Sequence, residues 1–107
     1  MKRYPVTMHR PSYRGADPKK RAKNLERHRI AERVERHLNE ALAQLPNNSI
    51  QVFLNYQVAA ELHESPALVA EIINGTDGGS NGITIVKGSF EKARLNAGRP
   101  PEEWDET

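Results

Sequence analysis

A run of 27 residues without glycine or proline, residues 19–45, constrains the fold of this chain more than any other feature. Asp17 can cap the run, and Pro18 suits the first helical position, where its missing N–H leaves no bond unmade. Pro46 then ends the run. Apolar side chains recur along it at intervals of three and four, at Ala31, Val34, Leu38, Ala41 and Leu45. We therefore expect one long amphipathic helix, whose stripe packs on its own domain or, alternatively, forms a homodimer seam.

Shorter elements follow the long helix and are separated by turn residues. Residues 49–53 alternate in polarity and residues 83–86 are β-branched throughout, so we expect two short strands that pair with each other. Three short helices are expected, at residues 56–63, 66–74 and 90–95. Gly75 is expected just past the end of the second of these. The predicted fold class is mainly α with a small β-sheet.

The composition indicates that part of the chain lies outside the core. Hydrophobic residues make up 36% of the chain and charged residues 28%, whereas globular domains are typically about 45–50% apolar. We expect disordered termini, which divides the chain into a basic arm (residues 1–16), a folded domain (17–88), and a short helix with an acidic tail (89–107). The chain has no cysteine and no apolar run of membrane or signal-peptide length. We therefore expect a soluble, cytoplasmic protein with no disulfide and no cysteine-bound metal.

The net charge of +2 conceals a strongly polarised chain. Residues 1–36 contain twelve Lys or Arg and four acidic residues, whereas residues 37–86 contain five acidic residues and no Lys or Arg. Clustered Lys and Arg are the electrostatic signature of phosphate binding. The basic arm also contains Tyr4, His9 and Tyr13, which could stack on the bases of a single strand.

The residues between the two expected strands carry a family resemblance. Residues 55–74 read N-Y-Q-V-A-A-E-L-H-E-S-P-A-L-V-A-E-I-I-N. The spacing of Val58, Ala59, Leu62, Ser65, Val69 and Ile72 resembles the helix-turn-helix family, in which the apolar positions form a shared core and the serine caps the second helix. With the flanking strands, residues 30–88 look like a winged helix with a tri-helical core. The resemblance implies a DNA-binding domain whose wing is formed or approached by residues 75–82.

The sequence departs from this family at the turn and on the second helix. His63 stands where the turn usually has glycine, and Glu64 stands where the next position is often apolar. The outward positions of the second helix are expected to be Pro66, Ala67, Ala70, Glu71 and Asn74. None of these is Arg, Lys or Gln, the side chains that most often reach guanine or adenine edges.

The basic arm and the resemblance together predict a small nucleic-acid-binding protein, with duplex DNA favoured over RNA, that acts in transcription regulation. The expected contacts are Lys19, Lys20, Arg21, Lys23, Arg27, Arg29, Asn74, Asn81 and Lys87. The alternative is a protein-interaction module that binds a regulator or polymerase component. Its expected contacts are Ala67, Ala70, Glu71 and Trp104. We find no pattern typical of catalysis, and expect no enzyme activity, metal or cofactor.

Overall fold

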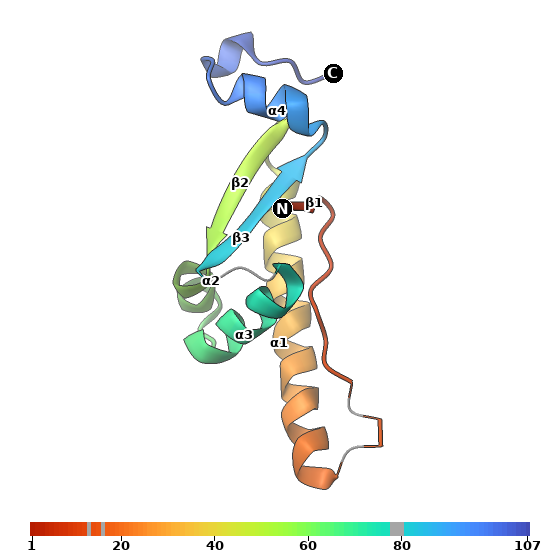
Figure 1. Ribbon diagram of the computed structural model, residues 1–107. Helices are drawn as coiled ribbons and strands as arrows, with labels where there is room; N and C mark the ends of the chain where they lie inside the picture. Colours follow the sequence, from red (N-terminus) through yellow and green to blue (C-terminus); the bar gives the residue numbers. More distant parts are fainter. Residues whose placement is uncertain (13, 16, 78–80) are drawn as a thin grey trace.

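A single long helix, α1 (Pro18–Ala43), is the axis of the computed structural model, which describes residues 1–12, 14–15, 17–77 and 81–107. Asp17 caps it as expected, because its Oδ1 accepts a hydrogen bond from the Lys20 N–H at 2.9 Å. The helix makes the molecule elongated, with extents of 55 × 25 × 22 Å. Figure 1 shows that α1 begins at one end of the molecule, beyond the reach of the other helices.

The sheet has three strands, β1 (Lys2–Arg3), β2 (Ser49–Leu54) and β3 (Gly82–Lys87), in the order β1-β3-β2. β2 and β3 are antiparallel, with Phe53 opposite Ile83 and Ile50 opposite Val86. This pairing confirms the two predicted strands. β1 adds a parallel pair at the other edge of β3 and was not predicted. The fold class, mainly α with a small β-sheet, is as expected.

Two short helices, α2 (Asn55–Leu62) and α3 (Pro66–Asp77), follow β2 and precede β3 in the chain. They pack on each other and on α1. The prediction that Gly75 ends the second of these is wrong, because α3 continues through it to Asp77. Gly75 instead allows a close approach. A Cβ at this position would lie 3.0 Å from Cδ2 of His9, which packs against the helix there.

The turn between α2 and α3 contains a left-handed residue although it has no glycine. His63 has φ 54° and ψ 43°, the left-handed conformation for which glycine is the usual choice. Ser65 follows, and its Oγ accepts a 3.4 Å hydrogen bond from the Leu68 N–H at the start of α3. The two predicted short helices are therefore joined by a turn that has a left-handed histidine in place of a glycine.

The core lies where α1, the helix pair and the sheet meet. Of the predicted stripe of α1, Ala31, Val34 and Leu38 have no measurable exposure there, as does Leu42, whereas Ala41 and Leu45 are half-buried. The helix pair contributes Val58, Ala59, Val69 and Ile72, all at most 2% exposed. Because other parts of the same chain cover this face of α1, its alternative interpretation as a homodimer seam is wrong.

The expectation that residues 1–16 form a disordered arm is wrong for most of that segment. Residues 4–12 run as an extended strap along α1 (Figure 1), with Val6 and Met8 only 3% and 2% exposed. Side chains of α1 take the place of a neighbouring strand. Asn39 both donates to and accepts from the Val6 backbone at 2.9 Å, and Glu35 accepts from the Met8 N–H at 2.9 Å.

Two further side chains of α1 continue this ladder towards the start of the helix. His28 Nε2 lies 2.6 Å from the Pro11 carbonyl oxygen, and Asn24 donates to the Ser12 carbonyl at 2.7 Å. Side chains of α1 therefore hold the strap by backbone groups of Val6, Met8, Pro11 and Ser12, without a neighbouring strand. The predicted residue Tyr13 lies outside the described residues, and Tyr4 packs against the core.

The acidic tail is also ordered, contrary to expectation. After α4 (Phe90–Asn96) and a 3₁₀ turn, Pro101–Glu103, the chain folds back. The buried amides of Asn48 and Asn96 both donate to the Asp105 carbonyl at 2.8 Å. Trp104 Nε1 donates to the Arg99 carbonyl at 2.9 Å. Two buried asparagines thus hold a tail whose composition alone suggested disorder.

The expected wing is absent from the described residues. In the predicted arrangement, residues 75–82 approach or form a wing beside the second helix. Residues 75–77 instead belong to α3, residues 78–80 lie outside the described residues, and β3 pairs with β2. After β3 the chain turns at Gly88, with φ 85°, into α4 rather than returning as a strand.

Candidate nucleic-acid interface

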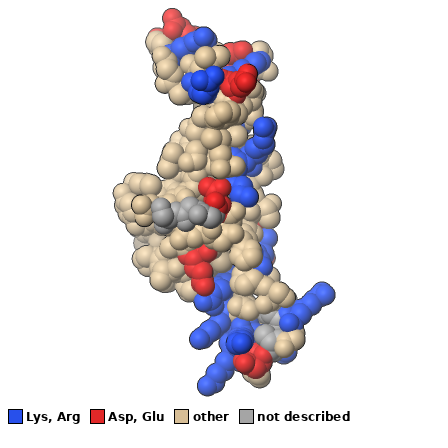
Figure 2. All heavy atoms as spheres, in the orientation of Figure 1, with Lys and Arg blue, Asp and Glu red and all other residues tan. Residues whose placement is uncertain are grey.

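The first two turns of α1 carry four of the predicted contacts, Lys19, Lys20, Arg21 and Lys23, all exposed. The first turn holds no acidic residue. Helix N-termini carry a partial positive charge, so cations placed there oppose the helix dipole and one another. Figure 2 shows the result as a concentration of Lys and Arg around the end where α1 begins. This arrangement is unfavourable in the free protein and is relieved by a bound anion.

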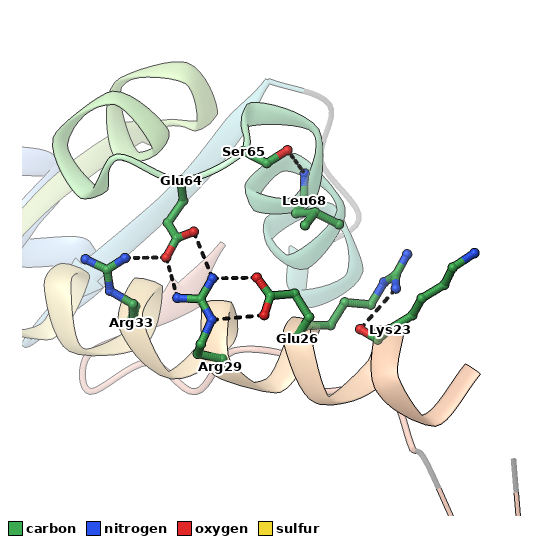
Figure 3. A network of polar contacts seen from close by, with 8 residues as sticks. Lys23, Glu26, Arg29, Arg33, Glu64, Ser65 and Leu68 are labelled. Atoms are coloured by element: carbon green, nitrogen blue, oxygen red, sulfur yellow. Dashed lines mark hydrogen bonds and ion pairs between the residues drawn. The ribbon is translucent and has the colours of Figure 1, made fainter. Parts of the chain in front are cut away.

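The lysine side chains in this group are not neutralised by the rest of the molecule. In the part of the chain that the structure describes, the ammonium groups of Lys19, Lys20 and Lys23 have no hydrogen bond or ion pair. Figure 3 shows the Lys23 side chain extending away from the neighbouring polar network. We name Lys19, Lys20, Arg21 and Lys23 the basic end of α1.

A pocket of about 490 Å³ lies beside the basic end, between α1, α3 and the strap. Lys20, Lys23, Asn24 and Arg27 line it from one face of α1, where spacings of three, four and seven residues place side chains together. The opposite walls are formed by His9 and Pro11 of the strap and by Glu71, Ile72 and Gly75 of α3. The volume is within the range of about 300–1,000 Å³ typical of ligand sites.

Arg27 belongs to this pocket but is already engaged. Its Nε donates to Glu71 Oε2 at 2.7 Å, and its Nη1 donates to the Lys23 carbonyl at 3.2 Å. Glu71, which was expected to face a partner from α3, is therefore partly neutralised by α1. Arg27 is fixed in place rather than free to follow a flexible ligand.

Arg29 points to a different face and lies in a network with acidic residues (Figure 3). It donates to Glu26 and, at 2.7 Å, to Glu64, which is also contacted by Arg33. The hydrogen bond from Arg29 lowers the pKa of the Glu64 carboxyl and also that of Glu26. Arg29 therefore ties the turn before α3 to α1 and does not join the basic end.

This network also explains why the turn has Glu64 where an apolar residue is common. The Glu64 side chain is only 9% exposed, and the two arginines of α1 cover it. The sequence contained a signal for this contact, since an acid at a normally buried position requires a cationic neighbour. We did not predict the pair from the sequence because Arg29 and Glu64 are 35 residues apart.

Lys87 does not lie near the basic end. Its Nζ donates to the Leu42 and Leu45 carbonyls at 2.9 and 2.7 Å and lies 5.2 Å from the centre of the Tyr4 ring. The last carbonyls of a helix lack internal partners, and Lys87 satisfies two of those of α1, at Leu42 and Ala43. Its role as a wing contact was wrong for this reason.

The two predicted asparagine contacts do not line the pocket beside the basic end. Asn81 precedes β3, whereas Lys87 ends it, so a six-residue strand separates them by roughly 17–20 Å. Asn81 is exposed, and its carbonyl accepts from the Asn55 N–H at 2.9 Å. Asn74 is half-buried, with its Oδ1 buried and without a partner among the described residues. The nine predicted contacts therefore do not form one surface.

The residues of the alternative interface are divided in the same way. Ala67 is exposed, Ala70 is half-buried and Glu71 is paired with Arg27, all on α3. Trp104 belongs to the C-terminal segment, which lies beside α4 at the opposite end of the molecule from the start of α1 (Figure 1). Trp104 therefore cannot act together with the α3 residues in one small interface.

Sequence reasoning named His9 as a residue that could stack on bases, but missed Pro11 and the ordered strap that places both residues in the pocket. A signal for the strap was present, because Val6 and Met8 alternate with the polar Thr7 and His9 as in a half-buried extended segment. Among the described residues, no group of three or more His, Asp or Glu side chains is placed to hold a metal ion. No described helix combines the length and apolarity needed to cross a membrane.

Comparison with known proteins does not assign the chain to a family. No protein-family model, curated protein or solved structure matches it.

Proposed function

We propose that this protein binds nucleic acid, duplex DNA in particular, through phosphate contacts made by the basic end of α1, and that it serves as a small regulatory protein. One observation carries the proposal. Lys19, Lys20 and Lys23 gather without ion-pair partners among the described residues, at a helix N-terminus that their charges destabilise. A bound polyanion relieves this repulsion, and the release of its condensed counterions favours binding.

The helix that would read bases in a helix-turn-helix protein is not equipped to approach DNA alone. The segment that contains α2 and α3 has no Lys or Arg, and Glu71 on α3 would face the phosphates. The proposed contact is therefore with the sugar–phosphate backbone, which gives affinity without sequence preference.

The test is fluorescence anisotropy of a labelled random-sequence duplex titrated with the protein at several salt concentrations. Lys19→Glu with Lys20→Glu is compared with Arg94→Glu with Arg99→Glu, which makes the same charge change. Arg94 and Arg99 are exposed cations, without side-chain ion pairs among the described residues, at the opposite end of the molecule.

We expect the first pair to weaken binding about tenfold or more at low salt, and to reduce the slope of log K against log salt by about 1.8 for two lost phosphate contacts. The second pair should change affinity by about twofold or less, since it lies far from the contact. Equal losses for the two pairs would show a response to net charge alone and would overturn the proposal.

A further inference from the structure

The pocket beside the basic end has two chemically different halves. Lys20, Lys23 and Arg27 bring three positive charges and Glu71 one negative charge, which leaves a net +2 with His9 neutral. Pro11, the ring of His9, Gly75 and the nearly buried Ile72 form an apolar half. A ligand that satisfies both halves carries an anionic group and an apolar ring. A phosphodiester backbone alone fits only the cationic half.

The strap holds the pocket open in a defined shape. The His9 N–H donates to Thr76 Oγ1 at 2.7 Å, and the His9 ring lies against Gly75, where any larger residue would press on it. On the other side, Asn24 and His28 hold the strap at Ser12 and Pro11. The backbone is therefore held at His9 and on its C-terminal side, and the ring of His9 rests against Gly75.

We propose that this pocket accepts one unpaired nucleotide, with its phosphate against Lys20 and Lys23 and its base against His9 and Pro11. The inference rests on the proposed nucleic-acid function and extends it, because it adds a contact that an unpaired nucleotide makes and a closed duplex does not. Bases stack on aromatic side chains with little regard to sequence. Unpaired bases reach such a pocket, whereas bases within a duplex do not.

Glu71 offers a specific test because it is the acid within the pocket. Glu71→Gln removes one negative charge and releases Arg27 from its 2.7 Å ion pair. The matched control is Glu61→Gln, since Glu61 is also exposed and paired with one side chain, His37, but lies outside the pocket. Deoxyadenosine monophosphate is titrated into labelled protein and followed by NMR, with inorganic phosphate as a parallel ligand.

We expect the nucleotide to shift the signals of His9, Lys20 and Gly75, and to bind at least about twofold more tightly to Glu71→Gln than to Glu61→Gln. Inorganic phosphate should bind more weakly and leave the signals of His9 unchanged. If phosphate binds as well as the nucleotide, or if neither shifts His9, the pocket does not recognise a base and the inference is wrong.

A second pair of variants separates this inference from the proposed function. His9→Ala removes the ring, and Thr7→Ala is the matched change at an exposed position on the same strap. We expect His9→Ala to weaken a single-stranded 12-mer about fivefold or more, and to leave duplex binding within about twofold. If His9→Ala leaves the affinity for the single strand unchanged, the inference is wrong. If Lys19→Glu with Lys20→Glu leaves the affinity for the duplex unchanged, the proposed function is wrong.

Discussion

The two halves of α1 are built by opposite rules although they form one continuous helix. From Ile30 to Ala43, apolar side chains at helical spacing are fully buried under the helix pair, the sheet and the strap. From Pro18 to Arg29, the helix has no buried residue, and its one large apolar residue, Leu25, is 47% exposed. Packing stabilises the second half, whereas the first half carries charge that its own dipole disfavours.

The difference separates the part of α1 that packing stabilises from the part whose charges packing does not explain. A helix that served only to build the core would have acidic residues in its first turn and basic residues in its last. Here the first turn has no acid and the last turn no base. The Leu42 and Ala43 carbonyls in that last turn are satisfied instead by Lys87 of β3. The basic end is thus the part of α1 that folding does not explain.

The largest expected effect comes from the packed half. Leu38→Ala should destabilise the protein by about 2–5 kcal/mol, because Leu38 has no exposed surface and its loss leaves a cavity. Leu25→Ala, the same change on the same helix, should alter the free energy of unfolding by less than about 0.5 kcal/mol. Urea denaturation followed by circular dichroism measures both. Similar losses for the two variants would mean that the first half of α1 is packed after all.

A smaller effect is expected at the junction of the two halves, where Glu64 meets Arg29 and Arg33. Glu64→Gln should cost about 1–2 kcal/mol at neutral pH, since it weakens two charge-assisted contacts of a shielded carboxylate. The arginines lower the Glu64 pKa in the folded protein. Its contribution is therefore present above the ordinary carboxyl pKa and is lost as the pH falls through the lowered value.

The control for this variant is Glu40→Gln, an exposed acid of α1 without an ion pair among the described residues. Denaturation between pH 7 and pH 3 should show that Glu64→Gln loses part of the acid dependence seen in the wild type and in Glu40→Gln. Parallel curves for all three proteins would contradict the proposed role of Glu64.

Periodic patterns in the sequence predicted much of the fold. The spacing of Ala31, Val34 and Leu38 predicted the buried face of α1, and the two strands and their pairing followed from short apolar runs bounded by turns. The strap and the tail were missed for one physical reason. Their backbones are held by single side chains, such as Asn39 for Val6 and Asn96 for Asp105, and such contacts leave no period in the sequence.

The candidate site was predictable only in part. Local charge predicted the basic end, because its four members lie within five residues of one another. The pocket could not be predicted, since it joins residues of the strap, α1 and α3 that are far apart in sequence. The same is true of the correction at Lys87, whose partners on α1 are more than 40 residues away.

The smallest expected change tests the central claim most directly. The claim is that the basic end lowers the stability of the free protein and that bound phosphates stabilise it. Lys19→Glu with Lys20→Glu should raise the free energy of unfolding by about 1 kcal/mol at low salt, because acids replace cations beside the helix N-terminus. The Lys20→Glu change can also complete a capping box with Asp17, whose side chain already accepts from the N–H at that position.

The decisive measurement is urea denaturation of wild type and this double variant, each with and without duplex DNA at about a hundred times the wild-type Kd. The duplex should stabilise the wild type by about 2.7 kcal/mol and the variant much less. We therefore predict that the variant is the more stable protein alone and the less stable protein with DNA. The same order of stability under both conditions would contradict the account.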